Sequence, residues 1–381
     1  MKAINDIRLT LFFTRRMGLH HWDRVGNLQR EVAIYQALGQ RLKAVQFITY
    51  GGRQDRPYAA RLTPITVHPT PGYLPVLASQ LIFPQQYRIL LEKSDIFKTN
   101  QIPGAEIALW AKRKYGKKLI VRCGYLYSRF MEAHTSNRFR IRRAYQLEKM
   151  AFSHAEAGIV TSERDRKWII QTHGIRPEKI HVIPNYVVTD VFKPLSEHPK
   201  KYDLVCVSKA SPQKNLSTLL TALNRLKQTG HSPSLLLIGS AGEDVQLRQQ
   251  VERLKLQVTF IRRVVNFALP IYLNQARAFI LPSLYEGHPK ALLEAMSCGL
   301  PCIGTDVPGI QDDLQHKKNG YLCQTTPASL AEAIQTVLSD VHLQTILGDN
   351  ARLYIMDRYS LSKVLDLELT LIEQVLQSYQ K

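Results

Sequence analysis

The sequence contains few cysteines, and they show no pairing pattern. Its 381 residues include five, at positions 123, 206, 298, 302 and 323, with no CxxC spacing among them. An odd, scattered set of this kind argues against a disulfide framework and against a zinc site. We therefore predict that the cysteines are buried and act as small apolar residues in a reducing compartment.

Long apolar runs are also absent. No window approaches about 18 consecutive apolar residues, so we predict no transmembrane helix. Asp6 and Arg8 precede a short apolar run at 9–13, which does not fit a signal peptide. With 45% hydrophobic and 22% charged residues, the composition is typical of a soluble globular protein. We expect a cytoplasmic protein that is long enough for two domains.

Acidic residues are scarce in the first half of the chain. Residues 1–200 hold 33 Lys and Arg against 15 Asp and Glu, whereas residues 201–381 hold 18 against 16. Such an excess indicates a polyanionic partner, although a solvated basic face is the simpler interpretation. We expect no nucleic acid, because no RNA-recognition, helix-turn-helix or zinc-finger pattern is present. An anionic membrane surface remains a candidate for peripheral contact, through the basic amphipathic stretch at 138–152.

Both halves alternate short β-rich runs with amphipathic stretches. This order predicts an α/β fold with parallel sheets covered by helices. The expected strands lie at 7–13, 45–49, 96–99, 119–122, 158–161, 202–207, 234–238, 258–261, 279–282 and 301–304. The periodic pattern breaks between Pro184 and Pro194. We therefore predict four parts: an N-terminal domain at 1–183, a linker at 184–200, a C-terminal domain at 201–360 and a final helical segment at 361–381.

The segment 279–310 carries the strongest functional pattern. It reads as a buried strand, a loop with Glu286, a helix at 289–298 ended by Gly299, and a second strand. Glu294 lies inside this otherwise apolar helix, where a carboxylate is costly without a polar partner. Glu286 follows the carboxyl end of a strand, where open α/β sheets bind ligands. We predict that both acids face one binding site; the alternative is an unrelated loop acid and a salt-bridged helix residue.

A second polar loop lies at 207–215, between a strand end and a helix start. It carries Lys209, Lys214 and Asn215. Lysine ammonium groups and the backbone N–H groups of a helix start both attract phosphate. A pair of unit charges about 4 Å apart contributes roughly 4 kcal/mol at an effective dielectric constant of about 20, before desolvation. We predict a diphosphate site that needs no metal, whereas two solvated lysines are the alternative.

Together these motifs resemble the retaining, nucleotide-sugar-dependent glycosyltransferases of family 4. The resemblance rests on two glutamates separated by seven residues, on AMSCGLP at 295–301, on VPG at 307–309 and on the linker beginning IPN at 183–185. It implies the GT-B fold, with two Rossmann-like domains whose parallel sheets face each other across a cleft. It also implies transfer of a sugar from a nucleotide-diphosphate sugar, as co-substrate, to a hydroxyl of a glycan or lipid-linked acceptor. The resemblance further implies retention of configuration and a place in cell-surface polysaccharide or glycolipid synthesis. We expect the reaction to need no cofactor and no metal.

The resemblance also implies roles for individual residues. Lys214 and Glu286 would be the catalytic residues, on the diphosphate and on the transferred sugar. Lys209, at a position where the family usually has arginine, would help to bind the diphosphate, and Glu294 would hold the ribose hydroxyls. The remaining donor-binding residues would lie beside the sugar and phosphates, namely His288, Lys290, Ala291 and Gly18.

The sequence departs from the family pattern at three places. Tyr186 replaces the usual glycine of the linker, and GHP at 287–289 replaces GFG, which leaves the sugar open. The histidine expected after the strand at 119–122 is missing or displaced. His20 and His21, in the loop after the first strand, are candidate acid–base groups, although loop histidines are more often ordinary surface residues.

Two other functions fit the same residues. One is a nucleotide-sugar epimerase on the same scaffold, which would consume the donor without an acceptor. The other is a non-catalytic, polyanion-binding protein that has kept the fold and acts through its basic first half.

Overall fold

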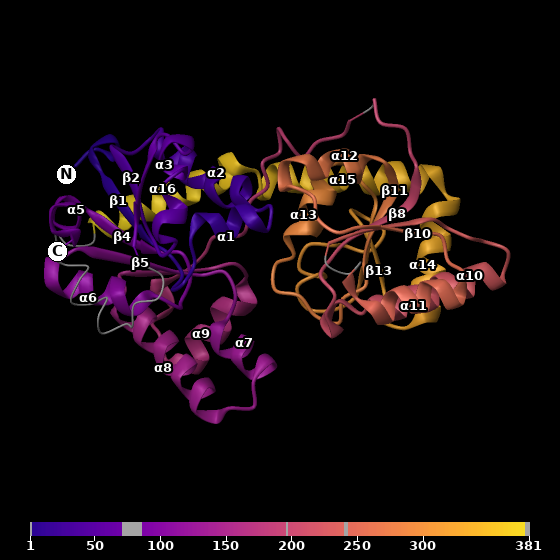
Figure 1. Ribbon diagram of the computed structural model, residues 1–381, viewed down its shortest axis with the longest axis horizontal. Coiled ribbons are helices and arrows are strands. Elements are labelled where there is room, and N and C mark those ends of the chain that lie inside the picture. Colours follow the sequence, from indigo (N-terminus) through magenta and orange to yellow (C-terminus); the bar gives the residue numbers. More distant parts are fainter. Residues whose placement is uncertain (1, 71–85, 196, 240–242, 378–381) are drawn as a thin grey trace. The chain divides into compact units, whose positions relative to one another are not determined.

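The computed structural model describes residues 2–70, 86–195, 197–239 and 243–377 (Figure 1). They form two compact units, each built around its own sheet. Unit 1 lies within Met1–Arg24, Glu31–Asn185 and Val364–Lys381, and unit 2 lies within Val25–Arg30 and Tyr186–Lys363. The first unit therefore combines most of the N-terminal half with the last described helical segment, and the second contains a short piece of the N-terminal half.

Unit 1 contains a seven-stranded parallel sheet in the order β3-β2-β1-β4-β5-β6-β7. The strands are β1 (Arg8–Phe12), β2 (Ala44–Thr49), β3 (Ile65–Pro69), β4 (Ile96–Thr99), β5 (Lys118–Cys123), β6 (Ala157–Val160) and β7 (Ile180–Val182). Most strand residues are apolar and buried, as in a sheet covered on both faces. In β6, all four residues are buried.

The helices associated with this sheet are α1 (Leu19–Arg24), α2 (Leu28–Gly39), α3 (Tyr58–Arg61), α5 (Arg88–Lys93), α6 (Ala105–Tyr115), α7 (Tyr127–His134), α8 (Arg138–His154), α9 (Glu163–His173) and α16 (Leu361–Gln377). Short 3-10 turns lie at Ile4–Asp6, Gly52–Asp55 and Pro177–Lys179. The last helix is tied to the sheet by a buried ion pair: Lys98 Nζ on β4 lies 2.5 Å from Glu368 Oε2 on α16.

Unit 2 contains a six-stranded parallel sheet in the order β10-β9-β8-β11-β12-β13. The strands are β8 (Tyr202–Val207), β9 (Leu235–Ile238), β10 (Val258–Ile261), β11 (Ala276–Leu281), β12 (Cys302–Thr305) and β13 (Tyr321–Cys323). The helices are α10 (Leu216–Gln228), α11 (Val245–Leu254), α12 (Leu269–Asn274), α13 (Lys290–Ser297), α14 (Pro327–Ser339) and α15 (Val341–Arg358), with 3-10 turns at Pro212–Lys214 and Asn266–Ala268.

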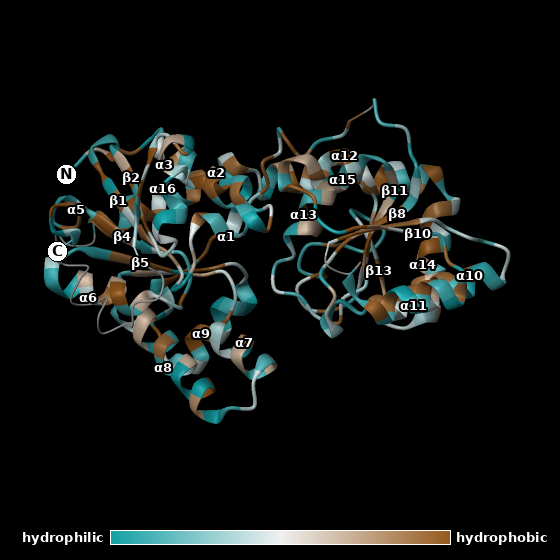
Figure 2. Ribbon diagram, in the orientation of Figure 1, coloured by the Kyte–Doolittle hydropathy of each residue, from teal (hydrophilic) through white to brown (hydrophobic). Residues whose placement is uncertain are grey.

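Two apolar clusters form the core of unit 2. One includes Leu219, Leu223 and Ile334, and the other includes Phe279, Leu292 and Met296. Figure 2 shows the matching pattern, with hydrophobic strands and helices that carry hydrophilic residues on part of their surface. Burying one such side chain contributes about 1.5–3 kcal/mol, so these two clusters anchor α10, α13 and α14 against the sheet.

The predicted α/β fold class is confirmed, and every predicted strand corresponds to an observed one. The sequence did not predict the short strands β3, β7 and β13. All five cysteines are buried, as predicted, and each is a free thiol. Among the described helices, none combines the length and apolar character needed to cross a bilayer.

Candidate functional site

The two motifs singled out in the second half follow neighbouring strands. The lysine loop follows β8 and the Glu286 loop follows β11, and these strands pair in parallel. Two hydrogen bonds join the loops: the Leu284 N–H donates to the Gln213 carbonyl, and Gln213 Nε2 donates to the Tyr285 carbonyl, both at 2.8 Å. Both motifs therefore lie at the carboxyl edge of the sheet, where α/β proteins bind ligands.

Lys214 and Glu286 are in direct contact at this edge. Lys214 Nζ lies 2.5 Å from Glu286 Oε1, which also accepts a hydrogen bond of 2.6 Å from the Ser283 hydroxyl. The Lys214 side chain is 21% exposed and that of Glu286 is 7% exposed. The predicted phosphate-binding cation and sugar-binding carboxylate thus form one polar centre that is still accessible to a ligand.

Special backbone conformations hold this centre in place. Asn215 has a left-handed conformation (φ 52°), which asparagine tolerates better than most residues. Gly309 also has a positive φ (88°), and a Cβ there would lie 2.3 Å from the Glu286 carbonyl oxygen. The Glu286 N–H donates to the Pro308 carbonyl at 3.0 Å. The VPG turn therefore supports the Glu286 loop, and only glycine fits at its third position.

Glu294 lies on α13 with a side chain that is 3% exposed, and it has the polar partners that such burial requires. Its Oε1 atom accepts hydrogen bonds from Arg30 Nη1 at 3.1 Å and from Asn266 Nδ2 at 2.8 Å. All three residues belong to unit 2. A carboxylate has about four acceptor positions, so these two contacts on one oxygen are compatible with further bonds to sugar hydroxyls.

Arg30 and Asn266 were not predicted from the sequence. The segment that carries Arg30 is held in unit 2 by two contacts: the Asn266 N–H donates to the Gly26 carbonyl at 2.8 Å, and the Tyr186 hydroxyl donates to the Arg30 carbonyl. No local signal marks Arg30, because its partner lies 264 residues further along the chain. Tyr186, at the usual glycine position of the linker, therefore has a structural contact of its own.

The remaining predicted donor-binding residues of unit 2 occupy different surroundings. The Lys209 side chain is exposed. Lys290 and Ala291 are half-buried in the first turn of α13, where helix N–H groups have no intrahelical acceptor.

The His288 side chain is buried, and its Nε2 lies 3.4 Å from Asp313 Oδ2. Burial and then the Asp313 carboxylate raise the pKa of Tyr359, whose ring lies 5.1 Å from that of His288. The imidazole therefore packs among polar groups inside unit 2.

Gly18 lies in unit 1, immediately before α1 and after β1. A Cβ at this position would lie 2.6 Å from Asp55 Oδ2 and 2.6 Å from the Gly51 Cα. The glycine therefore allows close packing against a buried carboxylate. The Gly18 N–H donates to His21 Nδ1 at 3.2 Å.

Arg122 ends the strand segment after which the family histidine is expected. Its Nη2 donates to Asn185 Oδ1 at 3.2 Å, and its Nη1 lies 3.9 Å from Glu368 Oε1. Its contacts are thus structural ones within unit 1. In the part of the chain that the structure describes, no three His, Cys, Asp or Glu side chains are grouped so that they could hold a metal ion.

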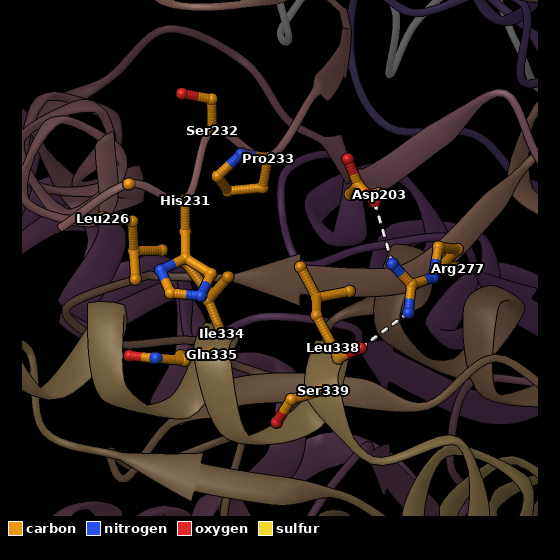
Figure 3. Close-up of a pocket in the computed structure, with 11 residues that line it drawn as sticks. Asp203, Leu226, His231, Ser232, Pro233, Arg277, Ile334, Gln335, Leu338 and Ser339 are labelled. Atoms are coloured by element: carbon orange, nitrogen blue, oxygen red, sulfur yellow. Dashed lines mark hydrogen bonds and ion pairs between the residues drawn. The ribbon is translucent and has the colours of Figure 1, made fainter. Parts of the chain in front are cut away.

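A cavity of about 370 Å³ lies elsewhere in unit 2 (Figure 3). It is lined by Asp203 near the start of β8, by Arg277 near the start of β11, and by residues of α10, α14 and the chain before β9. The Arg277 guanidinium bridges Asp203 Oδ1 at 3.1 Å and the Leu338 carbonyl at 2.6 Å. None of the predicted site residues lines this cavity, which lies towards the amino ends of the strands.

Two family profiles match consecutive parts of the chain. The profile of the glycosyl transferases group 1 matches residues 188–354, and that of glycosyltransferase family 4 matches residues 32–191. The first match contains the lysine loop and both glutamates. The second contains most of unit 1.

Characterised relatives are glycosyltransferases. The chain is 29% identical over 223 residues to N-acetyl-alpha-D-glucosaminyl L-malate synthase of Bacillus anthracis, covering 55% of this chain and 58% of that protein. It is 26% identical over 298 residues to UDP-Gal:alpha-D-GlcNAc-diphosphoundecaprenol alpha-1,3-galactosyltransferase of Escherichia coli, covering 74% and 76%. The chain thus spans little more than half the length of the first relative.

The fold is shared with solved structures of low sequence identity. HepE of Anabaena, solved in complex with UDP-glucose, superposes with a TM-score of 0.73 at 19% identity, covering 96% of this chain and 99% of that one. The two Rossmann-like units are therefore those of the GT-B fold. With both profiles, the relatives and the fold in agreement, the chain belongs to the group 1 glycosyltransferases of family 4.

Proposed function

We propose that this protein transfers a sugar from a nucleotide-diphosphate sugar to a hydroxyl of a glycan or lipid-linked acceptor, with retention of configuration. The observation that carries the proposal is the contact between Lys214 and Glu286 at the carboxyl edge of the second sheet. It unites a cation suited to a diphosphate and an acceptor suited to sugar hydroxyls in one accessible centre. Retention follows from membership of the family.

The names of similar proteins support a uridine nucleotide as donor. The Escherichia coli relative uses UDP-Gal and a diphosphoundecaprenol-linked acceptor, and the HepE structure holds UDP-glucose. We propose a UDP-hexose as the donor class and cell-surface polysaccharide or glycolipid synthesis as the setting.

Lys214 would stabilise the departing diphosphate, which gains negative charge as the glycosidic bond breaks. An ammonium group has three donor hydrogens, so it can keep its bond to Glu286 and still donate to phosphate oxygens. Glu286 would in turn accept hydrogen bonds from the transferred sugar. Lys209 would add a second positive charge to the diphosphate, as a point charge without the fork of an arginine.

Glu294 would hold the ribose hydroxyls, with Arg30 and Asn266 holding its carboxylate in place. The backbone N–H groups of Lys290 and Ala291, in the first turn of α13, would donate hydrogen bonds to phosphate oxygens, as N–H groups at helix starts commonly do. In this arrangement protein groups carry the whole interaction with the donor. We therefore expect the rate to be unchanged by EDTA.

We also propose peripheral contact with an anionic membrane through the hairpin of α7 and α8. Phe130 and Phe139 are 43% and 68% exposed on this hairpin. Five exposed arginines accompany them, at positions 129, 138, 140, 142 and 143, against one exposed acid, Glu132. Exposed aromatic rings among arginines suit the interface of an anionic lipid surface.

The donor is tested by titration calorimetry with UDP-, GDP- and ADP-sugars, on the wild type, on Lys214→Ala and on Lys201→Ala. Lys201 is an exposed lysine at the opposite end of β8, so its removal controls for lost charge. A UDP-sugar should bind to the wild type and the control, and more weakly to Lys214→Ala. Heat from heparin but from none of the sugars would favour a polyanion-binding protein. A changed sugar in the absence of acceptor would favour an epimerase.

A further inference from the structure

The loop that carries Glu286 is held by the chain at the end of β12. The segment 305–313, called the support segment below, forms two neutral hydrogen bonds with this loop. The Thr305 hydroxyl donates to the Ser283 carbonyl at 2.5 Å, and the Glu286 N–H donates to the Pro308 carbonyl at 3.0 Å. All of these residues belong to unit 2, so the support segment fixes the loop from within one unit.

A third contact between the same two segments involves ionisable side chains. His288 Nε2 lies 3.4 Å from Asp313 Oδ2, and these side chains are 4% and 1% exposed. The Tyr359 ring centroid lies 5.1 Å from that of the imidazole. Burial, followed by the Asp313 carboxylate, raises the pKa of the Tyr359 hydroxyl. The imidazole and the phenol therefore both face one buried carboxylate.

Core packing alone does not require these residue types. The neighbours of Asp313 along the chain, Ile310 and Leu314, are buried in one of the apolar clusters of unit 2. Apolar side chains of similar volume in place of a buried ion pair often give equal or greater stability. A buried polar network, in contrast, specifies one arrangement of the groups around it. The pair is thus suited to fixing the position of the loop.

The position that the pair fixes is that of the proposed sugar contact. His288 lies two residues after Glu286, on the same loop. Glu294 lies further along the chain, inside α13, where Arg30 and Asn266 hold its carboxylate. A change at His288 should therefore displace the Glu286 carboxylate and leave the proposed ribose contact in place.

We propose that His288, held by Asp313, is a positioning residue that aligns the Glu286 carboxylate with the sugar of the donor. The inference rests on the proposed function. The imidazole acts through the backbone that joins positions 286 and 288. Alignment matters because a displacement of about 1 Å in a site can lower a rate by about 10²-fold.

The test compares the affinities of the variants for two ligands by titration calorimetry. One is the nucleotide sugar that binds best to the wild type, and the other is its nucleoside diphosphate, which lacks the sugar. The variants are His288→Ala, Asp313→Asn and the double variant His288→Phe with Asp313→Leu, which makes the pair apolar. His342→Ala, at an exposed histidine of unit 2, is the matched control. The melting temperature and kcat are measured for each protein.

We expect His288→Ala and Asp313→Asn to bind the nucleotide sugar about tenfold or more weakly, the usual effect of losing a hydrogen bond to a charged group. Their affinity for the nucleoside diphosphate should stay within about twofold of wild type, and kcat should fall about 10- to 100-fold. The double variant should melt at or above the wild-type temperature, yet still bind the nucleotide sugar weakly. His342→Ala should match the wild type throughout.

A double variant with wild-type affinity for the nucleotide sugar would overturn the proposal, because the pair would then be needed for packing alone. Equal losses for the two ligands, or an unchanged affinity for the nucleotide sugar in both single variants, would overturn it too. Asp313→Asn keeps the shape of the side chain and carries the test if His288→Ala does not fold. Failure of the proposed function looks different, because no nucleotide sugar would then bind to the wild type.

Discussion

Lys214 Nζ lies 2.5 Å from Glu286 Oε1, although the two residues are 72 positions apart. The contact joins two loops that the sequence identifies separately, one as a phosphate site and one as a sugar site. Because the carboxylate pairs with the ammonium group, it holds that group at the carboxyl edge of the sheet.

We predict that Lys214→Ala lowers kcat by about 10²- to 10³-fold, the usual effect of removing one group that stabilises charge in the transition state. Glu286→Gln should also lower kcat, because the substitution alters both the proposed contact with the sugar and the ion pair with Lys214. Steady-state kinetics with saturating donor checks this. Lys201→Ala should retain the wild-type rate, and full activity of Lys214→Ala would contradict the assigned role.

Glu294→Ala should weaken donor binding, with little effect on kcat at saturating donor. Arg30→Ala should instead destabilise unit 2, because the buried Glu294 carboxylate loses one of its hydrogen-bond donors. Such a loss lowers the free energy of unfolding by about 1–3 kcal/mol. Calorimetry with the best UDP-sugar and thermal unfolding separate the two effects. Equal donor affinity in Glu294→Ala and wild type would contradict a ribose contact.

Glu368→Ala should destabilise unit 1 by about 3–5 kcal/mol, because it leaves the Lys98 ammonium buried without its carboxylate. Replacing both partners by apolar residues, as in Lys98→Met with Glu368→Leu, should restore most of the loss. All three tryptophans of the chain, at 22, 110 and 168, belong to unit 1. Tryptophan fluorescence during urea unfolding therefore reports on this unit. If Glu368→Ala unfolded with the same urea midpoint as wild type, the prediction would be wrong.

The ionised Asp55 should make the stability of unit 1 depend on acid pH. Burial alone would raise its pKa, but hydrogen bonds from Thr49, His20 and Leu19 outweigh burial. Its pKa is therefore lower in the folded state than in the unfolded chain, where aspartate titrates near 3.9. Its contribution is therefore fully present above about pH 4 and is lost as the pH falls through the folded pKa. Urea unfolding followed by tryptophan fluorescence should show a difference in stability between wild type and Asp55→Asn at pH 5. That difference should shrink below pH 4.

Reversing charge on the α7–α8 hairpin should abolish membrane binding. Arg142→Glu with Arg143→Glu should no longer sediment with vesicles that contain 30% phosphatidylglycerol, while wild type should sediment with them and not with neutral vesicles. Arg225→Glu with Arg253→Glu makes the same charge change on exposed residues of unit 2. Loss of binding in this control as well would attribute the effect to net charge.

The sequence predicts those elements whose signals are local. The helix α13 has a proline before its first residue and a glycine after its end, and its neighbours β11 and β12 are buried apolar runs. The strand β13 has only three residues, of which just Cys323 is buried, so it carries too little pattern to be predicted. The strand β3 also carries too little pattern to be predicted, because it lies at the edge of its sheet and ends in a proline.

Contacts between distant segments explain the other differences. The helix α1 begins at Leu19, where Asp55 caps it from 36 positions away. Glu294 was predicted to need a polar partner, and one of the two that it has is Arg30, from the first half of the chain. Residue spacing indicates that a buried carboxylate has a partner, but only the fold identifies it.

The salt bridge on α16 bears on the order in which the units are completed. Synthesis on the ribosome produces all seven strands of the first sheet early, yet the carboxylate that neutralises Lys98 is made only after the whole of unit 2. Until then, Lys98 lacks the carboxylate with which it pairs in the complete unit. This unit consequently reaches its full stability only after α16 has been synthesised, and deleting that helix would destabilise the unit that contains the first strands.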